Sequence, residues 1–119
     1  MHKVSNRMLK VGEAIKRELS TSLSRDIAEP QIQKLSITIS EVRVSPDLKV
    51  AKVYYLPMIK SELPEEILTK LLNQLMYRVK PLITKRLGLK FCPDLRFVYD
   101  TSFDSANLIS QRIRSELKD

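Results

Sequence analysis

The sequence predicts an α+β fold, a single domain in which helices cover one face of a three-stranded sheet. Its 119 residues, 43% of them hydrophobic, suffice for one domain with a buried core. Apolar residues recur every three or four positions in long segments, as in amphipathic helices, and alternate in three short segments, as in strands. The predicted order is helix, strand, strand, helix, helix, strand, helix, which favours helices packed on one side of a small sheet.

The first helix is predicted from Ser5 or Asn6 to Ile27. Both Ser5 and Asn6 are good N-cap residues. Gly12 costs about 1 kcal/mol relative to alanine but does not interrupt the pattern. Pro30 disfavours helical dihedral angles at the residue before it, so the helix should end before this proline. The apolar residues that define the helix are Met8, Val11, Ile15, Leu19, Leu23 and Ile27.

A β-hairpin is predicted next, with strands at residues 35–44 and 48–56. In the first strand the apolar side chains change from odd to even positions near Ser40 and Glu41. Such a change predicts a β-bulge, because one extra residue keeps the apolar side chains on the core face. The Ser-Pro-Asp sequence at residues 45–47 provides the turn.

A second long apolar series at helical spacing runs from Leu68 to Leu87 and contains Pro81. Pro64, followed by two glutamates, is typical of a helix start. Pro81 removes one backbone hydrogen bond and clashes with the carbonyl group of Tyr77. The segment is therefore either a kinked helix or two helices with Pro81 in the first turn of the second. We favour two helices.

A third strand is predicted at residues 95–100, where apolar and polar side chains alternate again after a Pro-Asp pair. Its place in the sheet does not follow from the sequence. Thr101 to Asp104 offer caps for a last helix at about residues 103–118, with apolar residues at helical spacing. The whole chain, residues 1–119, is thus expected to be one domain with its core at about residues 5–100.

The composition excludes several classes of enzyme site. Two glycines cannot supply a Walker loop or a dinucleotide fingerprint, and one cysteine with one histidine cannot supply a zinc site. We therefore expect a non-enzyme without cofactor or metal. Cys92 is predicted to be a small buried hydrophobe, and Phe91, Phe97 and Tyr99 are predicted to lie in the core. A lone cysteine and the lack of a signal peptide or membrane span predict a soluble, cytoplasmic protein.

The net charge of +7 favours a polyanionic partner. One stretch, residues 78–90, has five cations and no carboxylate: Arg78, Lys80, Lys85, Arg86 and Lys90. If a helix begins at Pro81, its free N–H groups and its dipole add to the side-chain charge, which predicts a phosphate-binding surface. Weaker candidates on the first helix, where acidic residues are interspersed, are Lys3, Arg7 and Lys10.

Two interpretations of this cationic run remain open, because a run of charges is often no more than a solvated helix face. If about five phosphates were neutralised, log K would fall with log salt at a slope of about −3.5 to −4.5. Few aromatic side chains are expected at the surface besides Tyr54, Tyr77 and Phe103. Recognition of folded RNA by phosphate contacts and shape is therefore favoured over base-specific recognition.

Two segments resemble the signatures of the ribosome-binding factor A family. They are Val-Arg-Val-Ser-Pro-Asp-Leu-Lys-Val-Ala-Lys-Val-Tyr at residues 42–54 and Pro-Asp-Leu-Arg-Phe-Val-Tyr-Asp-Thr-Ser at residues 93–102. The first helix is similar to the opening of that family, so the resemblance covers most of residues 4–105. The order of helices and strands up to residue 100 is also that of a type II KH domain.

The resemblance implies a KH-like domain that binds the free small (30S) ribosomal subunit and acts late in the maturation of 16S rRNA. It also implies a role in growth in the cold and no catalytic activity. The family lacks the Gly-x-x-Gly loop of ordinary KH domains and usually has an Ala-x-Gly kink between its two central helices. Here Leu-Met-Tyr stands at that place, residues 75–77, and Pro81 follows four residues later. We expect a monomer whose partner is 16S rRNA, with no membrane or small-molecule partner.

Two alternatives are weighed against this hypothesis. One is a generic KH-like adaptor whose basic face meets a protein or another RNA. The other is a nuclease with a metal held by Asp94, Asp100 and Asp104. These carboxylates are more typical of caps on the third strand and last helix, so a structural role is favoured for them.

Overall fold

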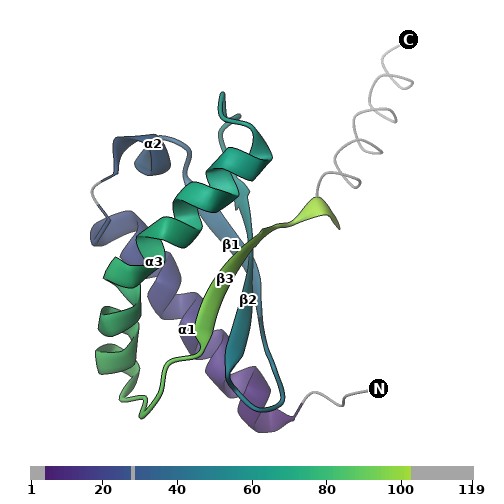
Figure 1. Cartoon of the computed structure of the whole chain (residues 1–119), viewed down its shortest axis with the longest axis vertical. Coiled ribbons are helices and arrows are strands. Elements are labelled where there is room, and N and C mark those ends of the chain that lie inside the picture. The colour runs from purple at the N-terminus through teal and green to yellow at the C-terminus, as the bar shows by residue number, and fades with distance from the viewer. Residues whose placement is uncertain (1–4, 28, 103–119) are drawn as a thin grey trace.

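The computed structural model describes residues 5–27 and 29–102, which form a three-stranded sheet with helices on one face (Figure 1). The strand order is β1-β2-β3, with β1 antiparallel and β3 parallel to β2. This mixed sheet confirms the α+β fold, whereas the C-terminal helix predicted at 103–118 lies outside the described residues. The helices and strands are α1 (Asn6–Arg25), α2 (Pro30–Gln33), β1 (Ile37–Val44), β2 (Val50–Pro57), α3 (Glu65–Leu87) and β3 (Asp94–Tyr99).

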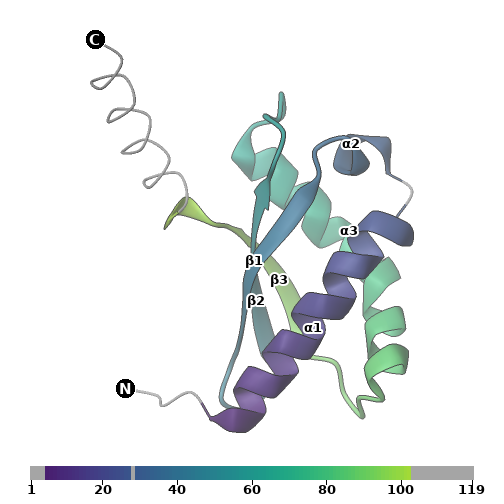
Figure 2. The ribbon, with the colours of Figure 1, turned by 180° about the vertical axis from the view of Figure 1, so that it is seen from behind.

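Helix α1 begins and ends close to the predicted residues. The Ser5 hydroxyl oxygen accepts a hydrogen bond from the Met8 backbone N–H at 3.2 Å, as an N-cap does. The short helix α2 was not predicted, and Pro30 occupies its first turn, where a missing N–H costs nothing. Figure 2 shows α1 lying across the sheet on the same side as α3.

Gly12 marks the closest approach of α1 to the sheet. A Cβ atom at this position would lie 2.8 Å from the carbonyl oxygen of Val42 in β1, nearer than real Cβ contacts allow. The absence of a side chain therefore lets the helix backbone pack against the strand, and this offsets the low helix propensity of glycine.

The predicted hairpin and its bulge are confirmed. The register runs from the pair Ile39 and Tyr55 to the pair Glu41 and Tyr54, so Ser40 is the extra residue in β1. The bulge keeps the buried side chains of β1 on the helix-covered face on both sides of it.

Helix α3 is a single helix from Glu65 to Leu87 with Pro81 inside it, so the prediction of two helices is wrong. Pro81 lies on the exposed side of the helix, while Val79 and Ile83 on either side of it are 0% exposed in the same core. Burial of both flanking turns outweighs the loss of one backbone hydrogen bond. Figures 1 and 2 show the axis of α3 changing direction along its length, as expected of a helix containing proline.

The core joins both helices to the sheet around Tyr55. Its ring is fully buried and makes edge-to-face contacts with Phe97 and Tyr99, each at 5.6 Å between ring centroids. The phenol hydroxyl group shares a hydrogen bond with Thr69 of α3, and burial raises the pKa of Tyr55. Cys92 is half-buried beside this core, and burial raises the pKa of its thiol.

Candidate nucleic-acid interface

The predicted cationic run lies on the C-terminal half of α3 and on the loop that follows it. Because α3 is continuous, no helix N-terminus lies within this run, and the expected contribution of free backbone N–H groups is wrong. Lys85 and Arg86 instead stand in the last turn of α3, where cations are stabilised by the negative end of the helix dipole. Any attraction for phosphate at this surface therefore comes from the side chains.

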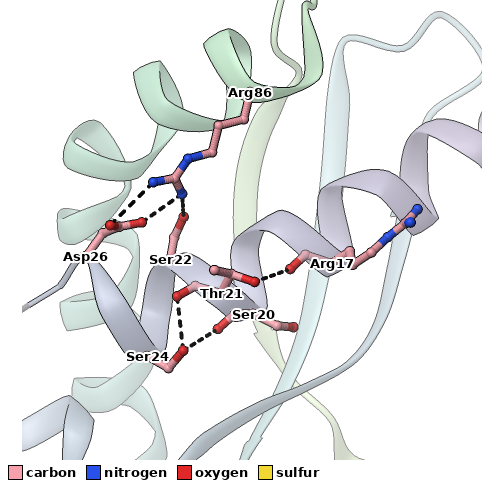
Figure 3. Close-up of polar contacts among 7 residues, drawn as sticks. All are labelled: Arg17, Ser20, Thr21, Ser22, Ser24, Asp26 and Arg86. Atoms are coloured by element: carbon pink, nitrogen blue, oxygen red, sulfur yellow. Dashed lines mark hydrogen bonds and ion pairs between the residues drawn. The ribbon is translucent and has the colours of Figure 1, made fainter.

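Arg86 does not belong to the unopposed cations. Figure 3 shows its guanidinium group reaching from α3 to Asp26 at the end of α1, with Nη1 at 2.8 Å from Oδ2. The same nitrogen donates to the Ser22 hydroxyl group at 3.3 Å. The hydrogen bond from Arg86 lowers the pKa of Asp26, and its counterpart raises the pKa of Arg86. Arg86 thus joins the two long helices, although the sequence around it contains no carboxylate.

The other four cations form what we call the α3 basic surface: Arg78, Lys80, Lys85 and Lys90. Arg78, Lys85 and Lys90 are exposed and Lys80 is half-buried. Within residues 5–27 and 29–102, none of the four forms an ion pair with a carboxylate. Their charge is therefore available to an external anion.

Tyr77 lies at the edge of the α3 basic surface and contacts Arg78. The Arg78 Nε atom donates to the Tyr77 hydroxyl oxygen at 3.1 Å, and the guanidinium carbon lies 5.6 Å from the ring centroid. The Tyr77 side chain nevertheless stays 69% exposed. A charged and an aromatic group are thus presented together.

Two open depressions flank Tyr77 and Lys80, which line both. The larger, of about 820 Å³, follows the C-terminal half of α3 and includes Lys85. The smaller, of about 370 Å³, lies between α3 and β3 and includes Arg96. Arg96 is also paired with Asp94 at 3.0 Å. An extended ligand could follow either depression, and its anionic groups would meet Lys80 in both.

The weaker candidates on the first helix lie elsewhere. Lys3 falls outside the described residues. Arg7 and Lys10 are exposed near the start of α1, roughly 20 Å along the helix axis from Ser22, where α1 meets Arg86. The structure therefore does not bring these cations next to Lys85.

Two of the three carboxylates considered as metal ligands, Asp94 and Asp100, make other contacts. Asp94 pairs with Arg96. Asp100 accepts hydrogen bonds from the Ser40 hydroxyl group and from the Ser102 backbone and hydroxyl groups, and the bond from Ser102 is the main cause of its lowered pKa. Asp104 lies outside the described residues. No group of three possible metal-ligating side chains occurs in the part of the chain that the structure describes.

Phe91 is where the predicted core is wrong. Its side chain is 82% exposed, in the loop that follows α3, whereas Phe97 is buried and Tyr99 is partly buried as expected. Gly88 ends the helix in a left-handed conformation with φ 61°, and β3 starts only at Asp94. The glycine was the signal that could have placed Phe91 in a surface loop.

Neither long helix of the described ranges is apolar enough to cross a membrane.

The exposed face of the sheet carries three further cations in one cross-strand row, Arg43, Lys52 and Arg96, which sequence patterns did not single out. Arg43 and Arg96 are each paired with a carboxylate of their own strand at 3.0 Å. This row is therefore largely neutralised, in contrast to the α3 basic surface.

Comparisons with known proteins agree on one family. The family model for ribosome-binding factor A matches residues 7–113. Ribosome-binding factor A of Ruegeria sp. (strain TM1040) is 44% identical over 121 residues, covering 97% of this chain and 91% of that protein. The crystal structure of ribosome-binding factor A from Thermus thermophilus is similar with a TM-score of 0.62 at 22% identity, covering 77% of this chain and 94% of that chain. A homology model of the Thermus thermophilus factor, fitted into a cryo-EM map of its complex with the 30S subunit, has a TM-score of 0.60 at 22% identity over 76% of this chain and 91% of its own.

Proposed function

The chain belongs to the ribosome-binding factor A family, a family of non-enzymatic ribosome assembly factors, and we propose that it binds the free 30S subunit during ribosome maturation. In this role it assists the late processing and folding of 16S rRNA and supports growth in the cold. It acts as a monomer in the cytoplasm. The RNA itself is the partner, and binding rather than catalysis is the activity.

The observation that carries the proposal is the α3 basic surface. Its four cations lie within 13 residues of chain, and no carboxylate from the described residues pairs with any of them. Ribosomal RNA is the most abundant polyanion that a ribosome assembly factor meets, and phosphate contacts supply most of the affinity in such complexes.

The fold supports this surface because α3 is attached to neighbouring elements at Asn73 and at Arg86. Asn73 accepts a hydrogen bond at 2.8 Å from the backbone N–H of Phe97 in β3. Arg86 is fixed to Asp26 of α1. Tyr77, Lys80 and the first part of the larger depression lie between these two attachments, so little ordering of the protein is needed on binding.

Sedimentation with purified ribosomal particles tests the proposal. The protein should sediment with free small subunits but not with assembled ribosomes, and the bound fraction should fall as salt is raised. An absence of salt-sensitive binding to small subunits would contradict it. Cells whose only copy carries Lys80→Glu and Lys85→Glu should accumulate precursor 16S rRNA, whereas normal maturation with this variant would favour an adaptor that uses another face.

A further inference from the structure

Two exposed aromatic side chains border the α3 basic surface. Phe91 is 82% exposed and Tyr77 is 69% exposed, the two highest values among the large exposed hydrophobic residues that the structure describes. Neither ring is needed for the core, which is closed by residues of the opposite face of α3. A structural role does not account for them, since both could be polar without loss of packing.

The local structure places Tyr77 in the larger depression and Phe91 two residues beyond the last residue that lines it. Tyr77 lines it directly, and so do Gly88 and Leu89 at the start of the loop that carries Phe91. Phe91 is therefore two residues along the chain from the end of this depression.

The surroundings of these two rings differ from those of the other exposed apolar residues. Met58, Ile59 and Ile67 lie at the other end of the molecule, where the backbone N–H groups of Met58 and Ile59 bond to residues 35 and 36. Those residues are aliphatic, whereas Tyr77 and Phe91 offer flat rings among Lys80, Lys85 and Lys90. Aromatic rings in a positively charged groove are the combination on which single-stranded nucleic acids stack their bases.

We propose that the α3 basic surface binds an unpaired segment of RNA whose bases stack on Tyr77 and Phe91 while its phosphates meet the lysines. The inference deepens the proposed function and rests on it. A paired base shows its ring face only at the end of a helix, so a duplex could use the lysines but not both rings. Base stacking on Tyr77 and Phe91 replaces the expectation from the sequence that RNA is recognised by phosphate contacts and shape alone. That expectation depended on Phe91 being in the core.

Fluorescence anisotropy with a labelled oligouridine and with a labelled RNA duplex of the same length tests this inference. Tyr77→Ala and Phe91→Ala should each lower the affinity for the single strand by about 5-fold to about 150-fold, the range measured for base stacking. The affinity for the duplex should stay unchanged, because the lysines remain. Tyr77→Phe keeps the ring and should restore most of the single-strand affinity.

A matched control removes exposed apolar side chains far from the lysines. The double variant Met58→Ala and Ile67→Ala should bind both RNAs like the original chain, and circular dichroism should show every variant folded. Unchanged single-strand affinity in the Tyr77 and Phe91 variants, or an equal loss for both RNAs, would overturn the inference. If small-subunit binding by the original chain persists in that case, the proposed function stands. If the original chain fails to bind small subunits, the proposed function and the inference fall together.

Discussion

Neighbouring residues of the same charge have different roles on α3. Lys85 is exposed and has no carboxylate partner among the described residues, whereas Arg86 is bound to Asp26 and Ser22 of α1. Arginine suits the second position because its planar group can contact both oxygens of a carboxylate, with Nη2 here at 3.4 Å from Oδ1. Substitutions at Lys85 should therefore affect binding, and substitutions at Arg86 should affect the attachment of α3 to α1.

Asp26→Asn should make the fold less stable at neutral pH but not in acid. The hydrogen bond from Arg86 lowers the pKa of Asp26 in the folded state, so this carboxylate stabilises the fold above its unfolded pKa of about 3.9. The stabilisation is lost as the pH falls through the folded pKa. In urea unfolding, the free energy of unfolding of the original chain should exceed that of the variant at pH 7. The two values should become equal below about pH 4. A difference that grows in acid would contradict this assignment.

Gly12→Ala should destabilise the protein although alanine is the better helix former. The new Cβ atom would lie 2.8 Å from the Val42 carbonyl oxygen, so α1 must move away from β1. Overpacking of this kind costs about 1–3 kcal/mol and outweighs the gain of about 1 kcal/mol in helix propensity. Urea unfolding should show a net loss of up to about 2 kcal/mol, while Ser20→Ala on the exposed side of the same helix should change little. An increase in stability would refute the close approach.

The elements themselves were largely predictable, because periodicity records which side chains face the core. The bulge followed from the change of parity near Ser40, and the register confirms it. The interruption expected at Pro81 did not occur. The local sequence shows the loss of one backbone hydrogen bond, but it does not show that Val79 and Ile83 are buried in the core of the folded chain. The parallel pairing of β3 with β2 also depends on tertiary packing.

The assignment of the candidate site depends on charge alone and stays a prediction. Arg78, Lys80, Lys85 and Lys90 come from the run without carboxylates, and Lys80 and Lys85 line the same depression. The partner of Arg86 is 60 residues away in the sequence, so no local pattern could reveal it. Phe91 was misplaced because hydrophobicity alone does not separate a core side chain from one presented by a loop.

At the level of elements, α3 depends on Asn73 for its attachment to the edge strand β3. The Asn73 side-chain oxygen accepts a hydrogen bond at 2.8 Å from the Phe97 backbone N–H, which the sheet leaves free. Asn73→Ala should lower the free energy of unfolding by about 1 kcal/mol and should speed hydrogen exchange at Phe97. Gln74→Ala, an exposed neighbour on the same helix, should do neither. Unchanged exchange at Phe97 would show that α3 does not fix the strand.

For the whole molecule, the charge of +7 includes cations that are paired with carboxylates, namely Arg43, Arg86 and Arg96, and unpaired cations such as those of the α3 basic surface. With Arg86 engaged by Asp26, four rather than five cations are available. Binding to a single-stranded RNA should therefore show a slope of log K against log salt of about −2.8, shallower than the value expected from the sequence. Titration of oligouridine at several potassium concentrations measures it. A slope no steeper than about −1 would mean that the α3 basic surface does not contact the phosphates.

We expect the molecule to bind the small ribosomal subunit through the α3 basic surface. The most direct test compares the dissociation constants for purified small subunits of two double variants with the same change in charge. Lys80→Glu and Lys85→Glu reverse the α3 basic surface, while Lys34→Glu and Lys60→Glu reverse two exposed lysines at the other end of the molecule. The first variant should lose at least about 100-fold in affinity, and the second should lose only the small, long-range part of the attraction. Equal losses in the two variants, or full affinity in the first, would contradict it.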